Sequence, residues 1–472
     1  MKHKIKIGNA QAFWGDRTEA ASWTLSLDPD IDYMTLDYLA EVSMSIMAIQ
    51  REKDPEAGYA KDFIEVVKSL IPYWKNGGKC RLITNAGGLH PLACAKECQK
   101  ILSNAGLKKN IGVVDGDDVL PYIKSGGKIT HLENREDLSS IQDKIVSANA
   151  YMGAYPIVEA LKKHADIVIT GRTADPSLTV APCIFEFGWK DSDWDLIAQA
   201  TVAGHLIECG TQVTGGISTR WLDLKRYLDI GYPIIEMQEN GEFVVTKPKN
   251  TGGLVNIEVV KEQLLYEIGD PNRYLSPDAT VSFLGISLSQ EGEDRVKVVG
   301  AKGSAPPDTL KVSITYQNGY KSESTLIVVG PHCIEKGKRI AEVIFHHTLK
   351  QGYDIETREV ECLGTGVLTI NPSHDREDAK ECVLRIAVAD PSLPDVTCSV
   401  AINLAILSRA ILIPWYALYV GVSYKRLHIS SALVISGSSN EKSTSTSFTI
   451  ISSLSVSGTS KKGFISGLGQ VM

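Results

Sequence analysis

The chain has 472 residues, of which 43% are hydrophobic and 22% are charged, a composition typical of a globular protein of about three domains. Its formal net charge is −7 at pH 7, and no run of Lys and Arg provides the basic face that nucleic acids and anionic membrane surfaces require. The composition therefore argues against both as partners.

The cysteines and the N-terminus predict the compartment. Nine cysteines, an odd number in a long chain, are typical of reduced thiols in a cytoplasmic protein. The N-terminal MKHKIKIGNA lacks the apolar run of a signal peptide. The apolar stretch at residues 411–424 is short and contains Pro414, so we expect no stable membrane insertion.

Up to about residue 231, short β-branched runs alternate with helical patterns. Apolar residues such as Phe63, Val67 and Trp74 recur at helical spacing between two such runs. This alternation predicts an α/β domain over residues 1–231, with a mostly parallel sheet flanked by helices, Rossmann-like and doubly wound. The expected strands lie within 4–10, 32–38, 80–88, 111–118 and 165–172, and the expected helices within 55–78, 91–106 and 156–165.

The pattern changes from about residue 232. A hairpin is expected about Asn240 and Gly241, because the Asn-Gly pair favours a tight turn between strands. Together these segments predict a smaller α+β domain over residues 232–400, and the Ser/Thr-rich residues 401–472 are expected to form a poorly ordered tail. The further strands are expected at 281–290, 295–303, 310–330, 361–370 and 381–390, with a helix at 333–352.

Polar and glycine residues follow the expected strands. The loops at the carboxyl ends of parallel strands converge on one crevice, so residues far apart in sequence can form one site there. We therefore expect a small-molecule ligand at this edge of the sheet. The candidate ligand-binding residues are Asn9, Asp37, Asn85, Gly87, Gly88, Thr211, Gly215 and Gly216.

The DGDD turn after the fourth expected strand carries Asp115, Asp117 and Asp118. Several carboxylates in one turn are typical of a hard-cation site, such as one for Mg²⁺, or of a general base. Alternatively, Asp117 or Asp118 caps a helix that begins near Val119. The pattern leaves both interpretations open.

The GRTADPS loop after the strand at 165–172 carries Arg172 and Asp175. A guanidinium is always charged and suits a carboxylate or phosphate, and Asp175 could act as a base or orient Arg172. The alternative is an internal Arg–Asp pair that holds the loop, with Asp175 as the N-cap of the next helix.

Gly87 and Gly88 precede a helix that begins at Pro91, and a helix N-terminus favours an anionic group. The alternative is a tight turn that needs a positive φ angle. His205 and Glu208 are expected near a helix end, where such a pair is more often part of a helix face than a site.

Six segments together, in this order, resemble the acyclic terpene utilisation (AtuA-type) family. The resemblance is strong over about residues 4–220 and weaker to about residue 400. It implies a role in the catabolism of methyl-branched acyclic terpenoids, whose intermediates are coenzyme A thioesters, but it names no reaction. The segments are GNAQAFWGDR, TLDYLAEVSMSIMA, TNAGGLHPLACA, DGDD, ANAYMGAYPIVEALKKHADIVITGRTADPSL and AGHLIECGTQVTGG. After the RIAVAD segment the family continues into a glycine-rich stretch that this chain lacks.

The expected function is that of a lyase or hydratase acting on a branched acyl-CoA thioester. Arg172 and the glycine loop would bind the anion, and Asp117, Asp118 or Asp175 would transfer protons. One alternative is a Mg²⁺-dependent enzyme on a phosphorylated substrate, with the cation held by the DGDD turn. The other is a non-catalytic subunit of an acyl-CoA complex. A homo-oligomer is compatible with all three.

Overall fold

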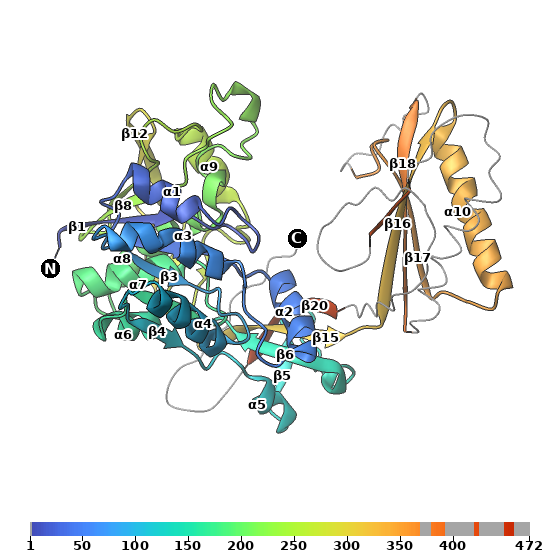
Figure 1. Cartoon of the computed structure of the whole chain (residues 1–472), viewed down its shortest axis with the longest axis horizontal. Helices are drawn as coiled ribbons and strands as arrows, with labels where there is room; N and C mark the ends of the chain where they lie inside the picture. The colour runs from blue at the N-terminus through green and yellow to red at the C-terminus, as the bar shows by residue number, and fades with distance from the viewer. Residues whose placement is uncertain (1, 369–378, 392–419, 424–447, 457–472) are drawn as a thin grey trace. The chain divides into compact units, whose positions relative to one another are not determined.

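The computed structural model describes residues 2–368, 379–391, 420–423 and 448–456 (Figure 1). The chain divides into two compact units, one formed by residues 1–316 with residues 450–472 and the other by residues 317–449. Among the described residues, each unit has its own β-sheet structure and its own hydrophobic packing, with three sheets in the first unit and one in the second.

The first unit is built on a nine-stranded sheet with the order β12-β13-β9-β8-β1-β2-β3-β7-β4. The five strands from β1 to β4 in this order pair parallel with one another, which confirms the expected α/β class with a parallel core. These strands are β1 (Lys4–Asn9), β2 (Tyr33–Leu36), β3 (Arg81–Thr84), β4 (Ile111–Val114) and β7 (Ile167–Thr170), and each lies within an expected strand.

Helices cover both faces of this sheet. Successive strand residues face opposite sides, so Tyr33 packs in one hydrophobic core and Met34 and Leu36 pack in the other. Because both faces are covered, the ends of the strands and their loops remain for a site. The helices α1 (Ala20–Leu27), α3 (Phe63–Lys75) and α4 (Pro91–Asn104) contribute to one core, and α6 (Tyr155–Lys162), α7 (Ser177–Phe187) and α8 (Trp194–Glu208) contribute to the other.

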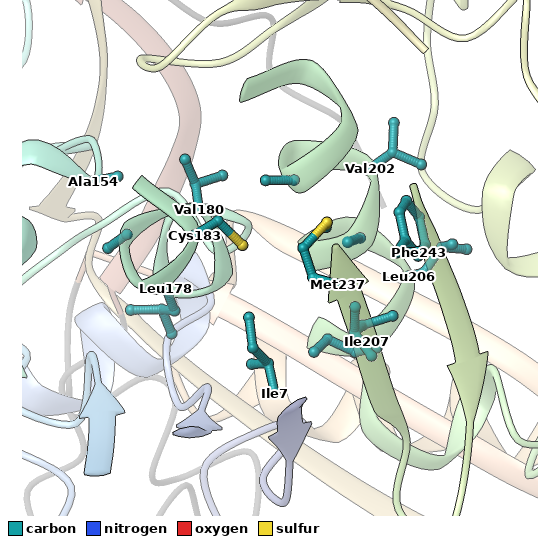
Figure 2. Packing of buried hydrophobic residues seen from close by; sticks show 14 of the residues in the cluster. Ile7, Ala154, Leu178, Val180, Cys183, Val202, Leu206, Ile207, Met237 and Phe243 are labelled. Atoms are coloured by element: carbon teal, nitrogen blue, oxygen red, sulfur yellow. The ribbon is translucent and has the colours of Figure 1, made fainter. Parts of the chain in front are cut away.

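Four antiparallel strands extend the sheet beyond β1. The expected hairpin about Asn240 and Gly241 is present, and its first strand pairs antiparallel with β1. Met237 and Phe243 of this hairpin lie in the same core as Ile7 (Figure 2), so the compact units divide at residues 316 and 317 rather than at the expected 231 and 232. The strands are β8 (Ile234–Gln238), β9 (Phe243–Thr246), β12 (Ser287–Gly292) and β13 (Arg295–Val299).

Two smaller antiparallel sheets complete the first unit, with the orders β5-β20-β15-β6 and β10-β11-β14. The pairing of β6 with β15 matters for the site, because it brings Tyr151 beside Lys311, whose backbone oxygen accepts from the Tyr151 N–H at 2.9 Å. The strands are β5 (Ile129–His131), β6 (Ile145–Ala150), β15 (Leu310–Gln317), β20 (Phe448–Val456), β10 (Tyr274–Leu275), β11 (Thr280–Ser282) and β14 (Lys302–Ser304). The remaining helices are α2 (Glu41–Lys53), α5 (Leu120–Lys124), α9 (Ile257–Leu265) and the 3₁₀ turns η1 (Gln142–Lys144), η2 (Gly210–Gln212) and η3 (Trp221–Asp223).

The second unit is an antiparallel sheet with the order β17-β18-β16-β19 and one helix, α10, which together give it α+β character. Leu326, Ile344, Leu384 and Ile386 belong to its core. Its elements are β16 (Tyr320–Val329), α10 (Cys333–Lys350), β17 (Thr357–Leu363), β18 (Glu381–Asp390) and β19 (Val420–Ser423). The strand expected at 361–370 thus begins earlier and ends earlier, and residues 369 and 370 lie outside the described residues.

The expected tail over residues 401–472 is described only in part. Within it the structure places two strands, β19 and β20, which pair with β16 and β5. The rest of the expected tail lies outside the described residues. Among the helices that the structure describes, none is both long enough and apolar enough to cross a membrane.

Candidate functional site

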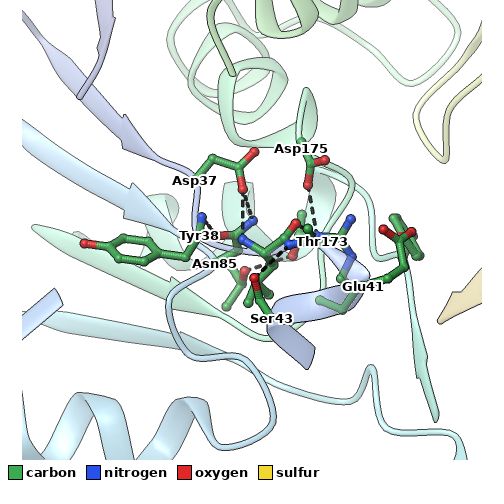
Figure 3. Close-up of polar contacts among 12 residues, drawn as sticks. Asp37, Tyr38, Glu41, Ser43, Asn85, Thr173 and Asp175 are labelled. Atoms are coloured by element: carbon green, nitrogen blue, oxygen red, sulfur yellow. Dashed lines mark hydrogen bonds and ion pairs between the residues drawn. The ribbon is translucent and has the colours of Figure 1, made fainter. Parts of the chain in front are cut away.

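The ends of β2 and β3 bring two predicted residues together. Asp37 follows β2 and Asn85 follows β3, and both side chains are buried. The Asn85 amide donates to Asp37 Oδ1 at 2.7 Å, and its own oxygen accepts from the Tyr38 N–H at 2.7 Å (Figure 3). Burial and the nearby charge of Asp175 raise the pKa of Asp37 well above its usual value.

The loop after β7 carries Arg172 and Asp175, which form the internal pair that the sequence left open as the alternative to a ligand-binding role. Arg172 Nη1 donates to Asp175 Oδ1 at 3.1 Å and to the Leu39 backbone oxygen at 2.6 Å. Arg172 is 2% exposed, whereas the Asp175 side chain is 30% exposed. The N-cap position of α7 is taken by Pro176 without any side-chain cap, so the Asp175 carboxylate is not used for capping. Burial raises the pKa of Asp175, although Arg172 opposes the shift.

Three further charged or aromatic residues surround Arg172, and none of them was predicted from the sequence. The Arg172 guanidinium lies 4.0 Å from the centre of the Tyr151 ring, and Lys311 Nζ lies 4.4 Å from it. Glu41 accepts from the Tyr151 hydroxyl and from Lys311 Nζ, the latter at 3.0 Å. Burial opposes ionisation of Glu41, but the charges of Lys311 and Arg172 lower its pKa to about 2. Glu41 is therefore ionised at neutral pH.

His205 and Glu208 lie at the C-terminal end of α8, and both side chains point into the interior. From the sequence, this pair is interpreted as part of a helix face rather than as a site. Their side chains are 2% and 11% exposed, and His205 Nδ1 lies 3.2 Å from Glu208 Oε1. Burial, followed by the charge of Asp175, raises the pKa of Glu208, so its environment resembles that of Asp37. The Asn9 amide donates to the backbone oxygens of Ile207 and Glu208, and so holds this helix end.

The DGDD turn separates its three carboxylates. Asp115 and Asp118 are exposed and accept from backbone N–H groups of the same turn, Asp118 from Leu120 at the start of α5. Asp117 is buried, and its Oδ2 accepts from Asn149 Nδ2 and from the Arg172 N–H, both at 2.8 Å. Burial raises its pKa to about 6. Among the described residues, no group of three or more His, Cys, Asp or Glu side chains is arranged to hold a metal ion.

A polar hollow of about 260 Å³ lies between this turn and the N-terminus of α4. Asn149 is 2% exposed, and its side-chain oxygen has no hydrogen-bond partner. The hollow is lined by Arg51, Leu89, His90, Pro91, Leu92, Asp115, Asp117, Asp118 and Asn149.

The two glycines before α4 lie close to the protein's own chain. A Cβ atom on Gly87 would lie 2.5 Å from the Thr170 backbone oxygen and 2.6 Å from Pro91 Cβ. Gly88 has a φ angle of +51°, and a Cβ atom there would lie 2.2 Å from Met47 Sδ. Close packing and a left-handed turn therefore account for both glycines.

The GTQVTGG segment also satisfies its own backbone. The Thr211 oxygen accepts from the Gly216 N–H at 2.8 Å, and Gly215 has a φ angle of +97°. These contacts form a tight turn that follows η2.

Of the predicted residues, the structure thus gathers Asp37, Asn85, Arg172 and Asp175 around one place, and adds Glu208 to them.

These features define an α/β protein with a buried carboxyl and arginine site at the carboxyl ends of parallel strands. The family model for the acyclic terpene utilisation family protein AtuA matches residues 5–424. The chain therefore belongs to the acyclic terpene utilisation family, and the match extends beyond residue 400, where the resemblance was expected to end. Comparisons with curated proteins and with solved structures find no match.

Proposed function

We propose that the protein is a cytoplasmic enzyme of acyclic terpenoid breakdown that transfers protons on a branched acyl-CoA thioester, as a lyase or hydratase does. Family membership supports the link to acyclic terpenes. One observation carries the chemistry: Asp37 and Asp175, from two different strand ends, lie with raised pKa values beside the buried Arg172.

Proton transfer is most efficient when the pKa of the group lies near the operating pH, whereas an ordinary Asp has a pKa near 4. Asp37, Asp175 and Glu208 all interact electrostatically with Arg172, and Asp175 also interacts with Glu41 and Lys311. The two cations, Arg172 and Lys311, cannot neutralise four carboxylates, so burial and mutual repulsion favour protonation of part of the group. Groups of this kind are typical of sites that move protons.

Asp175 is the group that we assign as the base. The Asp175 side chain is 30% exposed, whereas Asp37 is a buried residue, so a ligand reaches Asp175 more readily. Removal of a proton from the carbon next to the thioester carbonyl leaves the electron pair delocalised onto the carbonyl oxygen. Arg172 Nε is buried and has no hydrogen-bond partner, and we assign it to that oxygen.

The proposal changes the roles that the sequence assigned to the DGDD turn. Asp117 bonds to the backbone of Arg172 and to Asn149, so we assign it the support of the loop after β7. Asp118 accepts from Leu120 N at 2.9 Å, as expected of a residue at a helix start. A Mg²⁺-dependent reaction and a non-catalytic subunit remain as the alternatives that the test must separate.

A thermal-shift panel tests the substrate class. The ligands are coenzyme A, its branched acyl thioesters and sugar phosphates, each with and without Mg²⁺. A ligand at 100 times its Kd adds about 2.7 kcal/mol of apparent stability, which is visible as a rise in Tm. We expect the branched acyl thioesters to raise the Tm, and to do so without Mg²⁺.

Asp118→Asn provides the matched control, because the exposed Asp118 lies outside the group around Arg172. It should leave the shift unchanged, whereas Arg172→Lys should reduce it. Shifts from sugar phosphates only in the presence of Mg²⁺ would favour the Mg²⁺-dependent alternative. If no ligand moves the Tm and a second protein co-purifies in stoichiometric amount, the proposal fails in favour of a complex subunit.

A further inference from the structure

We propose that Glu208 is a neutral carboxylic acid at neutral pH, that it shares its proton with His205 Nδ1, and that it is the proton donor of the site. The role as donor rests on the function proposed above. The protonation state does not, because it follows from the hydrogen bonds of the protein itself.

The position of the hydrogen on His205 follows from its partner. His205 Nε2 lies 3.0 Å from the Gln263 backbone oxygen, and a carbonyl oxygen can only accept a hydrogen bond. Nε2 therefore carries the hydrogen, and in a neutral imidazole Nδ1 is then an acceptor. Nδ1 faces Glu208 Oε1 at 3.2 Å, so a proton must lie between two atoms that would otherwise both be acceptors.

This proton belongs either to Glu208 or to an imidazolium. The His205 ring is buried against Tyr274 and Phe283, with ring centroids 6.0 Å and 5.8 Å away, and burial lowers the pKa of His205 to about 4. Burial also raises the pKa of Glu208. Both groups therefore avoid charge, and the neutral pair is favoured over a buried ion pair.

The surroundings of Glu208 act in the same direction. The charged and titratable groups that face it come from the ends of β2, β7, α8 and α9 and from β10, and most of them are acidic. Arg172 is the cation among them, and it is already held by Asp175. The groups are Asp37, Asp175, Arg172, Cys209, Glu267 and Tyr274.

The second carboxyl oxygen is the one that we assign to the proton transfer. Glu208 Oε2 is buried and has no hydrogen-bond partner. A half-turn about the Cγ–Cδ bond exchanges the two oxygens and brings the protonated one to that free position. The O–H bond then breaks, the proton passes to an oxygen of the substrate, and its electron pair stays on the carboxylate. After turnover Asp175 releases to solvent the proton that it took from the substrate, and the Glu208 carboxylate regains one proton from solvent, so the protons balance.

Infrared spectroscopy of the whole protein tests the protonation state. At pH 7 the wild type should show a carboxylic-acid C=O band that Glu208→Gln lacks in the difference spectrum. Glu41→Gln is the control, because the pKa of Glu41 is lowered to about 2 and its removal should affect carboxylate bands only. Loss of a carboxylate band, rather than an acid band, in Glu208→Gln would overturn the inference.

The stability of Glu208→Gln provides a second readout. Gln is neutral and can donate an N–H to His205 Nδ1, as the protonated acid does. The variant should therefore keep or raise the Tm, and its advantage should grow from pH 5 to pH 8, because the wild type must take up a proton on folding. A Tm that falls at every pH would instead indicate an ion pair with an imidazolium and would overturn the inference.

The two tests separate this inference from the proposed function. If Glu208→Gln loses the acid band but no acyl thioester binds, the protonation state stands and the proposed function falls. If acyl thioesters bind and the acid band is unaffected by the substitution, the proposed function stands and the inference about Glu208 falls.

Discussion

At the scale of single residues, the environment decides what each carboxyl group can do. Glu41 lies beside Lys311 and Arg172, which lower its pKa to about 2, whereas burial raises the pKa of Asp117 to about 6. The two side chains differ by one methylene group. Their protonation thus depends on neighbours that come from other segments of the chain.

Asp117→Asn tests this difference. Both donors of Asp117 bond to Oδ2, so the oxygen of an Asn can accept from both. The pKa of Asp117 rises from about 4 in the unfolded chain to about 6 in the folded one, so its favourable contribution is full below about pH 4 and is lost as the pH rises through about 6. The side chain of Asn does not ionise, so the Asp117→Asn variant does not lose this stability as the pH rises.

We therefore expect the free energy of unfolding of Asp117→Asn, relative to wild type, to increase by up to about 3 kcal/mol between pH 4 and pH 7. Urea unfolding at a series of pH values measures it. Parallel pH profiles for the two proteins would show that Asp117 is ionised in the folded state as in the unfolded chain.

The sequence pattern was sufficient to place four candidate site residues in loops that follow strands. Asp37, Asn85, Arg172 and Asp175 each stand at the end of a β-branched run, where a parallel sheet brings them together. Lys311 could not be found in this way, because it lies 270 residues from Glu41 and reaches it only through the pairing of β6 with β15.

At the scale of elements, the turn between β3 and α4 shows why glycines occur there. At Gly87 the φ angle is not positive, but the neighbouring atoms leave no room for a Cβ atom. Gly88 has a positive φ angle and also lacks room for a Cβ atom. Gly77, at the end of α3, has a φ angle of +85° and open space around it. Alanine substitutions at these three glycines therefore distinguish the cost of a left-handed conformation from the cost of crowding by neighbouring atoms.

Alanine substitutions should rank accordingly. Gly77→Ala should lose about 1–2 kcal/mol of stability, the cost of a left-handed conformation alone. Gly87→Ala should lose about 1–3 kcal/mol through overpacking, because its nearest neighbour is backbone. Gly88→Ala combines strain with crowding against Met47 and should lose more than Gly77→Ala. Wild-type stability of Gly87→Ala in urea unfolding would contradict the packing explanation.

The strands and helices were predictable from local sequence patterns. The order in which the strands pair in the sheet was not. The hairpin about Asn240 and Gly241 was visible as two strands and a turn, and it is present. Its pairing with β1 depends on a strand more than 220 residues away, which local periodicity does not reveal. The boundary expected at residue 231 therefore differs from the division at residues 316 and 317.

At the scale of the whole molecule, the described residues form two compact units with separate cores, and the family match spans both. Every residue described in the candidate site lies in the first unit, from Asn9 to Lys311. The alternation of strands and helices predicted the α/β class of that unit, because both the period of the strands and that of the helices are visible in the sequence.

The most direct test of the central claim follows the hydrogen that the site is proposed to move. The protein is incubated in D₂O with a branched acyl-CoA thioester, and deuterium on the carbon next to the thioester carbonyl is measured by NMR. We expect the wild type to catalyse this exchange, Asp118→Asn to match it, and Asp175→Asn to be slower by about 10²-fold or more, as loss of a general base implies. Exchange at the wild-type rate in Asp175→Asn, or none in the wild type with the thioester bound, would contradict the account.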